Sequence, residues 1–148
     1  MPEKRTLERA HEDAREGKSA STQAGEFVRE EMHHVREGKH GAASTKQAIA
    51  IGLSKARRAG VKLPPPKTGS ASMRRKAAQD SARGSSGTKR KSATRSRATS
   101  KALKREGHRA ASKKALSRQA HSAARKRSHA QRSAAAKKAA RTRARNRS

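Results

Sequence analysis

The chain has 148 residues, with 40 Lys and Arg against 11 Asp and Glu, no cysteine and one aromatic residue, Phe27. Its formal net charge is +29, and 30% of its residues are hydrophobic. With this composition, much of the chain cannot bury enough apolar surface to offset the loss of conformational entropy on folding. The absence of cysteine excludes disulfides, thiolate metal sites and zinc fingers.

The first 17 residues are charged throughout and lack the apolar core of a secretory signal. No apolar stretch approaches the length that spans a bilayer. We therefore expect a cytoplasmic protein without a membrane partner. Because the charge is so strongly basic, we expect its partner to be a polyanion, and nucleic acid is the commonest one in a cell.

The run Leu63-Pro64-Pro65-Pro66 divides the chain into two parts that differ in charge and in apolar content. Residues 1–63 carry 13 Lys/Arg and 9 Asp/Glu, whereas residues 64–148 carry 27 Lys/Arg and 2 acids, Asp80 and Glu106. Most large apolar residues lie in the first part. A packed core is therefore predicted before the prolines and none after them.

Sequence signals for the start and end of a helix recur along residues 1–63. Small hydroxyl residues that suit an N-cap are followed, 11 to 17 residues later, by glycines that tolerate positive φ. These signals predict helices at roughly 6–16, 21–37 and 44–59. The N-caps would be Thr6, Ser21 and Ser44, and the glycines Gly17, Gly38 and Gly60. Ser44 and Gln47 have the spacing of a capping box, in which Gln47 would reach the Ser44 amide.

The predicted fold class is all-α, with this small three-helix unit followed by a largely disordered or partly helical basic tail. About ten large apolar residues form a thin core, and domains this small are marginally stable. The unit could be a loose monomer, a homo-oligomer, or a set of helices that firms up on binding a protein partner through residues 21–59.

Residues 64–100 are predicted to be a basic linker rich in Pro, Gly and Ser, with room for a short helix at 71–82. Residues 101–148 form a tail rich in Lys, Arg and Ala. The tail favours helix by composition, but its cations lie all round any helix drawn through it, so mutual repulsion should fray a free helix. Arg118, Arg125 and Arg132 recur every seven residues on one face of that helix.

The tail is the predicted nucleic-acid-binding segment, acting mainly through phosphate contacts. The candidate contact residues are Lys113, Lys114, Arg118, Arg125, Lys126, Arg127, Arg132, Lys137, Lys138, Arg141, Arg143, Arg145 and Arg147. Secondary candidates are Lys55, Arg57, Arg58 and Lys62. Without aromatic residues for stacking or a recognition-helix signature, we expect sequence-nonspecific binding that favours duplex over single strands.

No enzymatic or metal-binding constellation is recognised. The carboxylates of residues 30, 31 and 37 are interleaved with cations on a helix surface, and the core is too small for a pocket. His33 and His34 are adjacent and point about 100° apart on a helix, so they cannot chelate one ion together. We expect a non-enzymatic protein without metal or other cofactor.

Several strings resemble those of an uncharacterised family of short, Lys/Arg/Ala-rich bacterial proteins labelled as DNA-binding or plasmid-stabilisation proteins. They are MPEKRTLERA, STQAGEFVREEMHHVREGKHG, STKQAIAIGLSKARRAGVKLPPPK and, in the tail, ALSRQAHSAARKRS. The resemblance implies DNA association in a bacterial cytoplasm and transfers no site residue. The tail is similar to linker-histone tails in composition only.

Three functions follow from these observations. The leading one is a nonspecific, histone-like DNA-binding protein of the nucleoid. An alternative is an RNA- or ribosome-associated basic protein. The third is a protein-interaction module whose helices bind a partner while the tail localises it.

Overall fold

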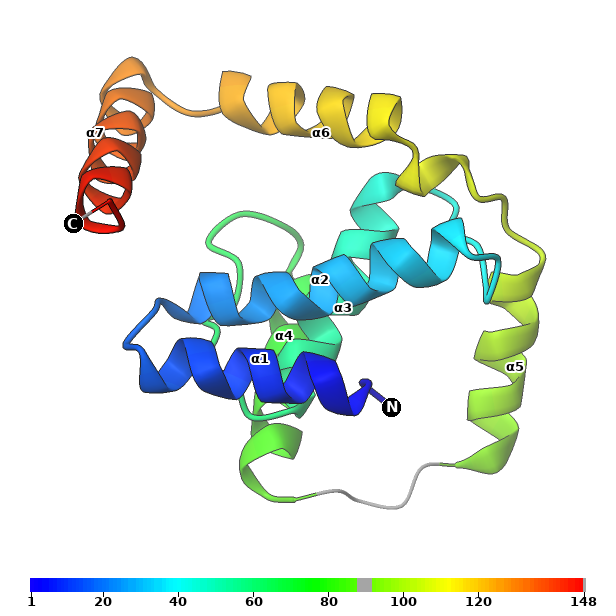
Figure 1. The fold of residues 1–148 in the computed structure, drawn as a ribbon. Coiled ribbons are helices and arrows are strands. Elements are labelled where there is room, and N and C mark those ends of the chain that lie inside the picture. Colours follow the sequence, from blue (N-terminus) through cyan, green and yellow to red (C-terminus); the bar gives the residue numbers. More distant parts are fainter. Residues whose placement is uncertain (88–91, 148) are drawn as a thin grey trace. The chain divides into compact units, whose positions relative to one another are not determined.

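A computed structural model describes residues 1–87 and 92–147 of the chain. These residues contain seven α-helices, one 3₁₀ helix and no strand (Figure 1), which confirms the all-α fold class. The chain divides into two units, residues 1–112 and residues 113–148, and we describe each unit by itself. Within the described ranges, no helix has both the length and the apolar character needed to cross a membrane.

The first three helices begin and end within two residues of the predicted positions. They are α1 (Lys4–Arg15), α2 (Ala20–Arg36) and α3 (Thr45–Arg58). The glycines that follow them have positive φ angles, 71° for Gly17, 74° for Gly38 and 96° for Gly60. A residue with a Cβ is disfavoured in this conformation, so glycine ends each helix at little steric cost.

The helix starts agree with the predicted caps less well. The Ser44 hydroxyl does accept a hydrogen bond from the Gln47 amide at 3.1 Å. The Gln47 side chain, however, accepts from the amide of Ala43 and not of Ser44. Thr6 is buried inside α1, and Ser19 rather than Ser21 caps α2. Helix α1 begins after Glu3, which makes no side-chain cap, and α2 is capped two residues before the predicted Ser21, because the cap depends on where the chain turns.

The core of residues 1–112 is built around α2, which packs against both α1 and α3 (Figure 1). Phe27 on α2 is buried between them with small residues from the neighbouring helices. The core cluster consists of Ala10, Ala24, Phe27, Ala56 and Val61. Because alanines dominate this cluster, the helix backbones approach closely. A Cβ on Gly52 of α3 would lie 2.7 Å from the Cα of Val28 on α2.

The predicted linker contains a helix that packs against the core. Ser70 caps α4 (Ala71–Ser85), which lies against α3. Asp80 of α4 is 1% exposed and accepts a hydrogen bond from the Ser54 hydroxyl of α3. The nearby cation of Lys76 lies 3.2 Å from the same carboxylate. One of the two acids in the basic part of the chain therefore holds α4 in place. Residues 88–91 of the predicted linker lie outside the described residues.

Two further elements complete this unit, α5 (Ala93–Lys104) and the 3₁₀ helix η1 (Arg109–Ala111). The hydroxyl of Thr45 donates to the Ala110 carbonyl at 2.6 Å, and Nε of Arg36 donates to the Ala111 carbonyl at 2.8 Å. Ala110 and Ala111 are buried against α2 and α3. The expectation that nothing beyond the prolines joins a core is therefore wrong, because alanine packs without a large apolar side chain.

Residues 113–147 contain α6 (Lys113–Arg125) and α7 (His129–Arg145). Ser128 and Gln131 form a capping box at the start of α7, which the sequence analysis missed. The prediction of a largely disordered tail is wrong, since most of these residues are helical. The high helix propensity of Ala, Lys, Arg and Gln, together with the cap, outweighs repulsion between exposed cations that solvent and salt screen.

Candidate nucleic-acid interface

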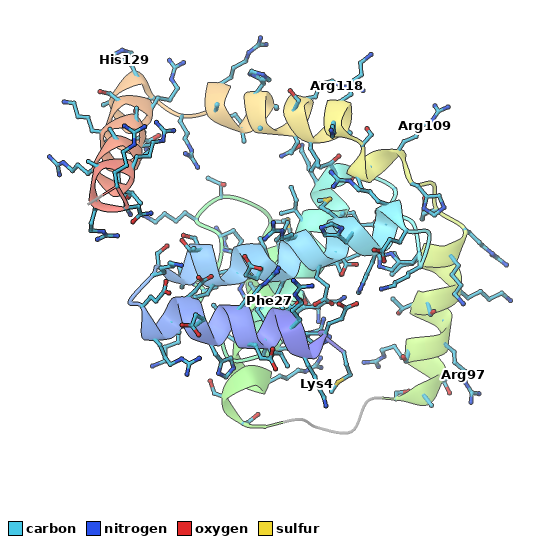
Figure 2. All side chains as sticks on the ribbon, viewed as in Figure 1. Lys4, Phe27, Arg97, Arg109, Arg118 and His129 are labelled. Carbon is cyan, nitrogen blue, oxygen red and sulfur yellow. The ribbon has the colours of Figure 1, made fainter. Side chains whose placement is uncertain are left out.

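Helix α6 carries three of its four cations on one face, and the fourth, Lys113, lies about 100° away at the first position of the helix. Lys114, Arg118 and Arg125 follow i, i+4, i+11 spacing and therefore share a face. Ala115 and Leu116 are half-buried and lie on a separate face. The side chain of Arg118 extends away from the helix (Figure 2). The helix thus presents a narrow basic stripe with an alanine-rich back.

The predicted face with Arg118, Arg125 and Arg132 spaced seven residues apart on one helix does not form. Arg118 and Arg125 belong to α6, but the chain leaves the helix after Arg125, and Arg132 lies on α7. The capping box at Ser128 starts a new helix and breaks the register. Helix α7 instead carries its cations on two opposite sides, so either side can meet a polyanion. Arg132 and Arg143 lie on one side, and Lys137, Lys138, Arg141 and Arg145 on the other.

All the Lys and Arg residues of this segment are exposed. Residues 113–148 contain 13 Lys/Arg and no Asp or Glu, and each of these 13 cations is exposed in the described range. The structure therefore brings the 13 candidate residues onto α6, α7 and the turns beside them. The segment contains no Asp or Glu, so its side-chain charge is uniformly positive and lies at the surface, where an external anion can reach it.

A second basic face lies on α5, which the sequence analysis treated as part of the linker and the start of the tail. Arg97, Lys101, Lys104 and Arg105 follow i, i+4, i+7, i+8 spacing and line a shallow, open depression with Ser96 and Ser100. All four cations are exposed, and Figure 2 shows Arg97 extending from the helix. The helical spacing of these cations was the signal that could have identified this face.

Two of the secondary candidates are occupied within the fold. Nζ of Lys55 lies 2.6 Å from Oε2 of Glu31. The guanidinium of Arg57, which is 8% exposed, donates to the carbonyl oxygens of Leu63 and Pro64 at 3.3 and 3.0 Å. Lys55 therefore joins α3 to α2, and Arg57 joins α3 to the proline run.

The other two secondary candidates lie closer to solvent. Nε of Arg58 donates to the Ser54 carbonyl at 3.2 Å and lies 3.8 Å from Asp80. Lys62 is exposed. Of these four residues, Lys62 is therefore the one most accessible to a polyanion.

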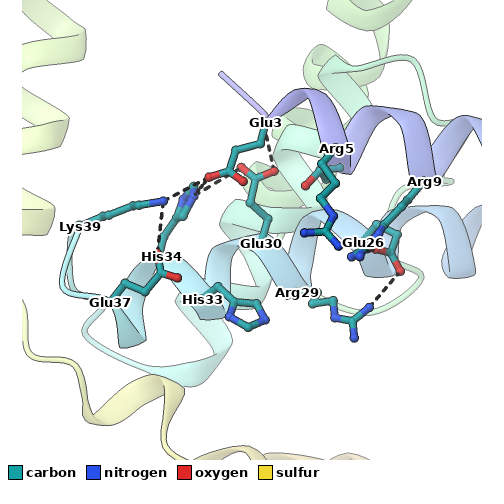
Figure 3. A pocket seen from close by; sticks show the side chains of 11 residues that line it. Glu3, Arg5, Arg9, Glu26, Arg29, Glu30, His33, His34, Glu37 and Lys39 are labelled. Atoms are coloured by element: carbon teal, nitrogen blue, oxygen red, sulfur yellow. Dashed lines mark hydrogen bonds and ion pairs between the residues drawn. The ribbon is translucent and has the colours of Figure 1, made fainter.

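The N-terminal end of the first unit has a different electrostatic character. An open polar depression there is lined by cations and acids together, among them Glu3, Arg5 and Lys39 (Figure 3). Oε1 of Glu3 lies 2.9 Å from Nε2 of His34 and 3.2 Å from Nζ of Lys39. These two hydrogen bonds lower the pKa of Glu3, and the bond that Lys39 donates to Glu3 raises the pKa of Lys39. Because its charges neutralise one another, this surface is a poor site for a polyanion.

A family model described as "Family of unknown function (DUF6496)" matches residues 15–68. This range covers α2, α3 and the proline run, and the basic helices lie outside it. The match fits the expectation of an uncharacterised family, but its description names no DNA-binding or plasmid-stabilisation role. Neither the curated proteins nor the solved structures contain a match to the chain.

Proposed function

We propose that the chain binds duplex DNA without sequence specificity, through phosphate contacts of the cations on α6 and α7. The observation that carries this proposal is the complete absence of acidic residues from residues 113–148, combined with the exposure of all 13 cations there. In residues 1–112 the remaining cations share the chain with all 11 acids, and several form ion pairs.

The dimensions of the helices suit a duplex. Helix α7 has 17 residues and is therefore about 25 Å long. Along that length a DNA duplex carries about 15 phosphates. The phosphates outnumber the Lys and Arg side chains of α7, so each cation has a partner within reach. The basic face of α5 would add contacts of the same kind.

Base recognition is not part of the proposal. The single aromatic residue of the chain, Phe27, is buried in the core and cannot stack on a base. The exposed contact residues are Lys and Arg, whose phosphate contacts carry no sequence information. Two duplexes of unrelated sequence should therefore bind with similar affinity.

The test measures salt dependence with the full-length chain. Anisotropy of a labelled duplex of about 20 base pairs, titrated between about 50 and 200 mM salt, gives the slope of log affinity against log salt. Replacing Lys114, Arg118 and Arg125 with Gln removes the α6 stripe. If these residues contact phosphates, the slope should become shallower by about 2.7, because each contact contributes about 0.9.

A matched control removes three exposed cations from the acid-containing part, as Lys4→Gln/Arg5→Gln/Lys46→Gln. This variant has the same net charge as the α6 variant. Its slope should differ from the wild-type slope by less than about half of the 0.9 that one contact contributes. Equal slopes in the two variants would overturn the proposal, because binding would then follow total charge. Tighter binding to an RNA duplex of equal length would replace DNA with RNA as the target.

A further inference from the structure

The loop after α2 brings together three potential metal ligands from separate positions in the sequence. One ring nitrogen of His34, one of His40 and a carboxylate oxygen of Glu31 all lie within 4.8 Å of one another. Glu31 and His34 lie three residues apart on α2, while His40 follows the turn at Gly38. The sequence analysis compared His33 with His34, but His33 is exposed and points elsewhere.

The hydrogen bond made by His40 shows which of its nitrogens faces the cluster. Nδ1 of His40 lies 2.9 Å from the carbonyl oxygen of Gly41, which can only accept a hydrogen bond, so Nδ1 carries a proton. Nε2 lies 2.8 Å from Oε1 of Glu31, which is also an acceptor. Nε2 is therefore the ring nitrogen of His40 that can bind a metal ion beside this carboxylate.

Glu31 is a buried carboxylate whose partners are poorly oriented. Its side chain is 1% exposed, and neither oxygen has a partner with hydrogen-bond geometry among the described residues. Nζ of Lys55 nevertheless lies 2.6 Å from Oε2. This contact occupies one oxygen and leaves Oε1, the oxygen beside His40, as the one available to a cation.

The surrounding charges favour an added cation. Glu30, 3% exposed, lies beside the cluster, with Oε1 4.0 Å from Nε2 of His34 and 3.6 Å from Nζ of Lys55. Glu3 approaches His34 from α1 at 2.9 Å (Figure 3). A carboxylate bonded to a histidine ring fixes its orientation in many metal sites. The three carboxylates around the two rings, those of Glu3, Glu30 and Glu31, thus outnumber the two ammonium groups of Lys39 and Lys55 that contact them.

We propose that Glu31, His34 and His40 form a site for a divalent transition-metal ion, and that Zn²⁺ fits this donor set best. Two imidazoles and one carboxylate are a ligand set that zinc proteins use. Tetrahedral zinc places its ligand atoms about 3.3 Å apart, so small side-chain rotations bring the three donors into range. The ion would join α2 to the loop at residues 39–42, where Gly41 also donates to Leu103 at 2.9 Å.

The test uses the metal-free full-length chain, with Co²⁺ as a spectroscopic probe and Zn²⁺ as its competitor. The wild type should develop visible Co²⁺ absorption that saturates at one equivalent and is displaced by Zn²⁺. His40→Gln and His34→Gln should each weaken binding by at least about tenfold, since even the loss of a group outside the ligand set commonly costs that much. Zn²⁺ should raise the unfolding temperature of the wild type and not of these variants.

The matched control is His33→Gln, which removes the neighbouring exposed imidazole and should bind Co²⁺ as the wild type does. If either variant loses helicity without metal, the test uses the imidazole signals in the NMR spectrum of the wild type. Zn²⁺ should shift the signals of His34 and His40 and leave those of His33 unchanged. Absence of a saturable Co²⁺ band, or equal shifts of all histidines, would overturn the site, the second result indicating only ions loosely held at the surface.

Discussion

Residues 1–112 and residues 113–148 are both helical, yet they use charged side chains in opposite ways. In the first unit, acids lie in or beside the packed interfaces, where Glu31 pairs with Lys55 and Asp80 anchors α4. In the second unit there are no acids and no buried residues in either helix. Charge that is paired contributes to the fold, and charge without an internal partner is left for an external one.

The sources of helix stability differ as well. Helices α1, α2 and α3 bury alanines and Phe27 against one another, so tertiary packing stabilises them. Helices α6 and α7 rely on intrinsic propensity and on the cap at Ser128. The two units should therefore respond independently to substitutions, and the predictions below separate them.

The largest effect is expected from Gly52→Ala. The new methyl would lie 2.7 Å from backbone of Val28, so α2 and α3 must separate. Overpacking of this kind costs about 1–3 kcal/mol, which urea unfolding of the first unit measures. The control is Gly25→Ala on α2, where nothing lies within 4 Å of the added methyl. It should be neutral or stabilise by up to about 1 kcal/mol. Similar destabilisation by both would contradict the close packing of α2 on α3.

A smaller, local effect is expected from Ser128→Ala. This change removes the hydroxyl that accepts from the Gln131 amide at 3.2 Å. Loss of an N-cap costs about 1 kcal/mol, so amide exchange in the first turn of α7 should accelerate about fivefold. Ser133→Ala, in the interior of α7, should slow or leave exchange unchanged. The unfolding midpoint of the first unit should not move in either variant, and a shift would show that the units are coupled.

The smallest effect concerns Glu3, whose pKa is lowered by hydrogen bonds from His34 and Lys39. A carboxylate with a lowered pKa stabilises the fold above its ordinary value of 4.5, and this contribution is lost as the pH falls below that value. Between about pH 5 and 3 the wild-type unfolding temperature should therefore fall more steeply than that of Glu3→Gln. The control Glu8→Gln, which removes an exposed carboxylate on the same helix, should keep the wild-type slope.

Much of the fold was predictable because its signals are local. Gly17, Gly38 and Gly60 end helices by their own backbone freedom, and the first three helices lie close to the predicted ranges. The basic, acid-free character of the tail needs no coordinates. The capping box at Ser128 is equally local, but repulsion between the tail cations favoured a largely disordered or partly helical tail, whereas the structure has most of it in helices.

Other features could not be predicted because they join residues that are distant in the chain. Nothing local distinguishes Gly52, which sits against Val28, from Gly25, which faces open space. Nothing local shows that Arg57 is buried while Lys62 is exposed.

The order of residues by itself determined the helical class, the helix ends at glycine and the separation of charge along the chain, since each depends on neighbours within a few positions. The tertiary structure alone decided which cations are paired, which carboxylates are buried, and that Glu31, His34 and His40 meet. These outcomes depend on how α2, α3 and the loop between them pack, because burial and Coulomb interactions depend on distance in space and not along the chain.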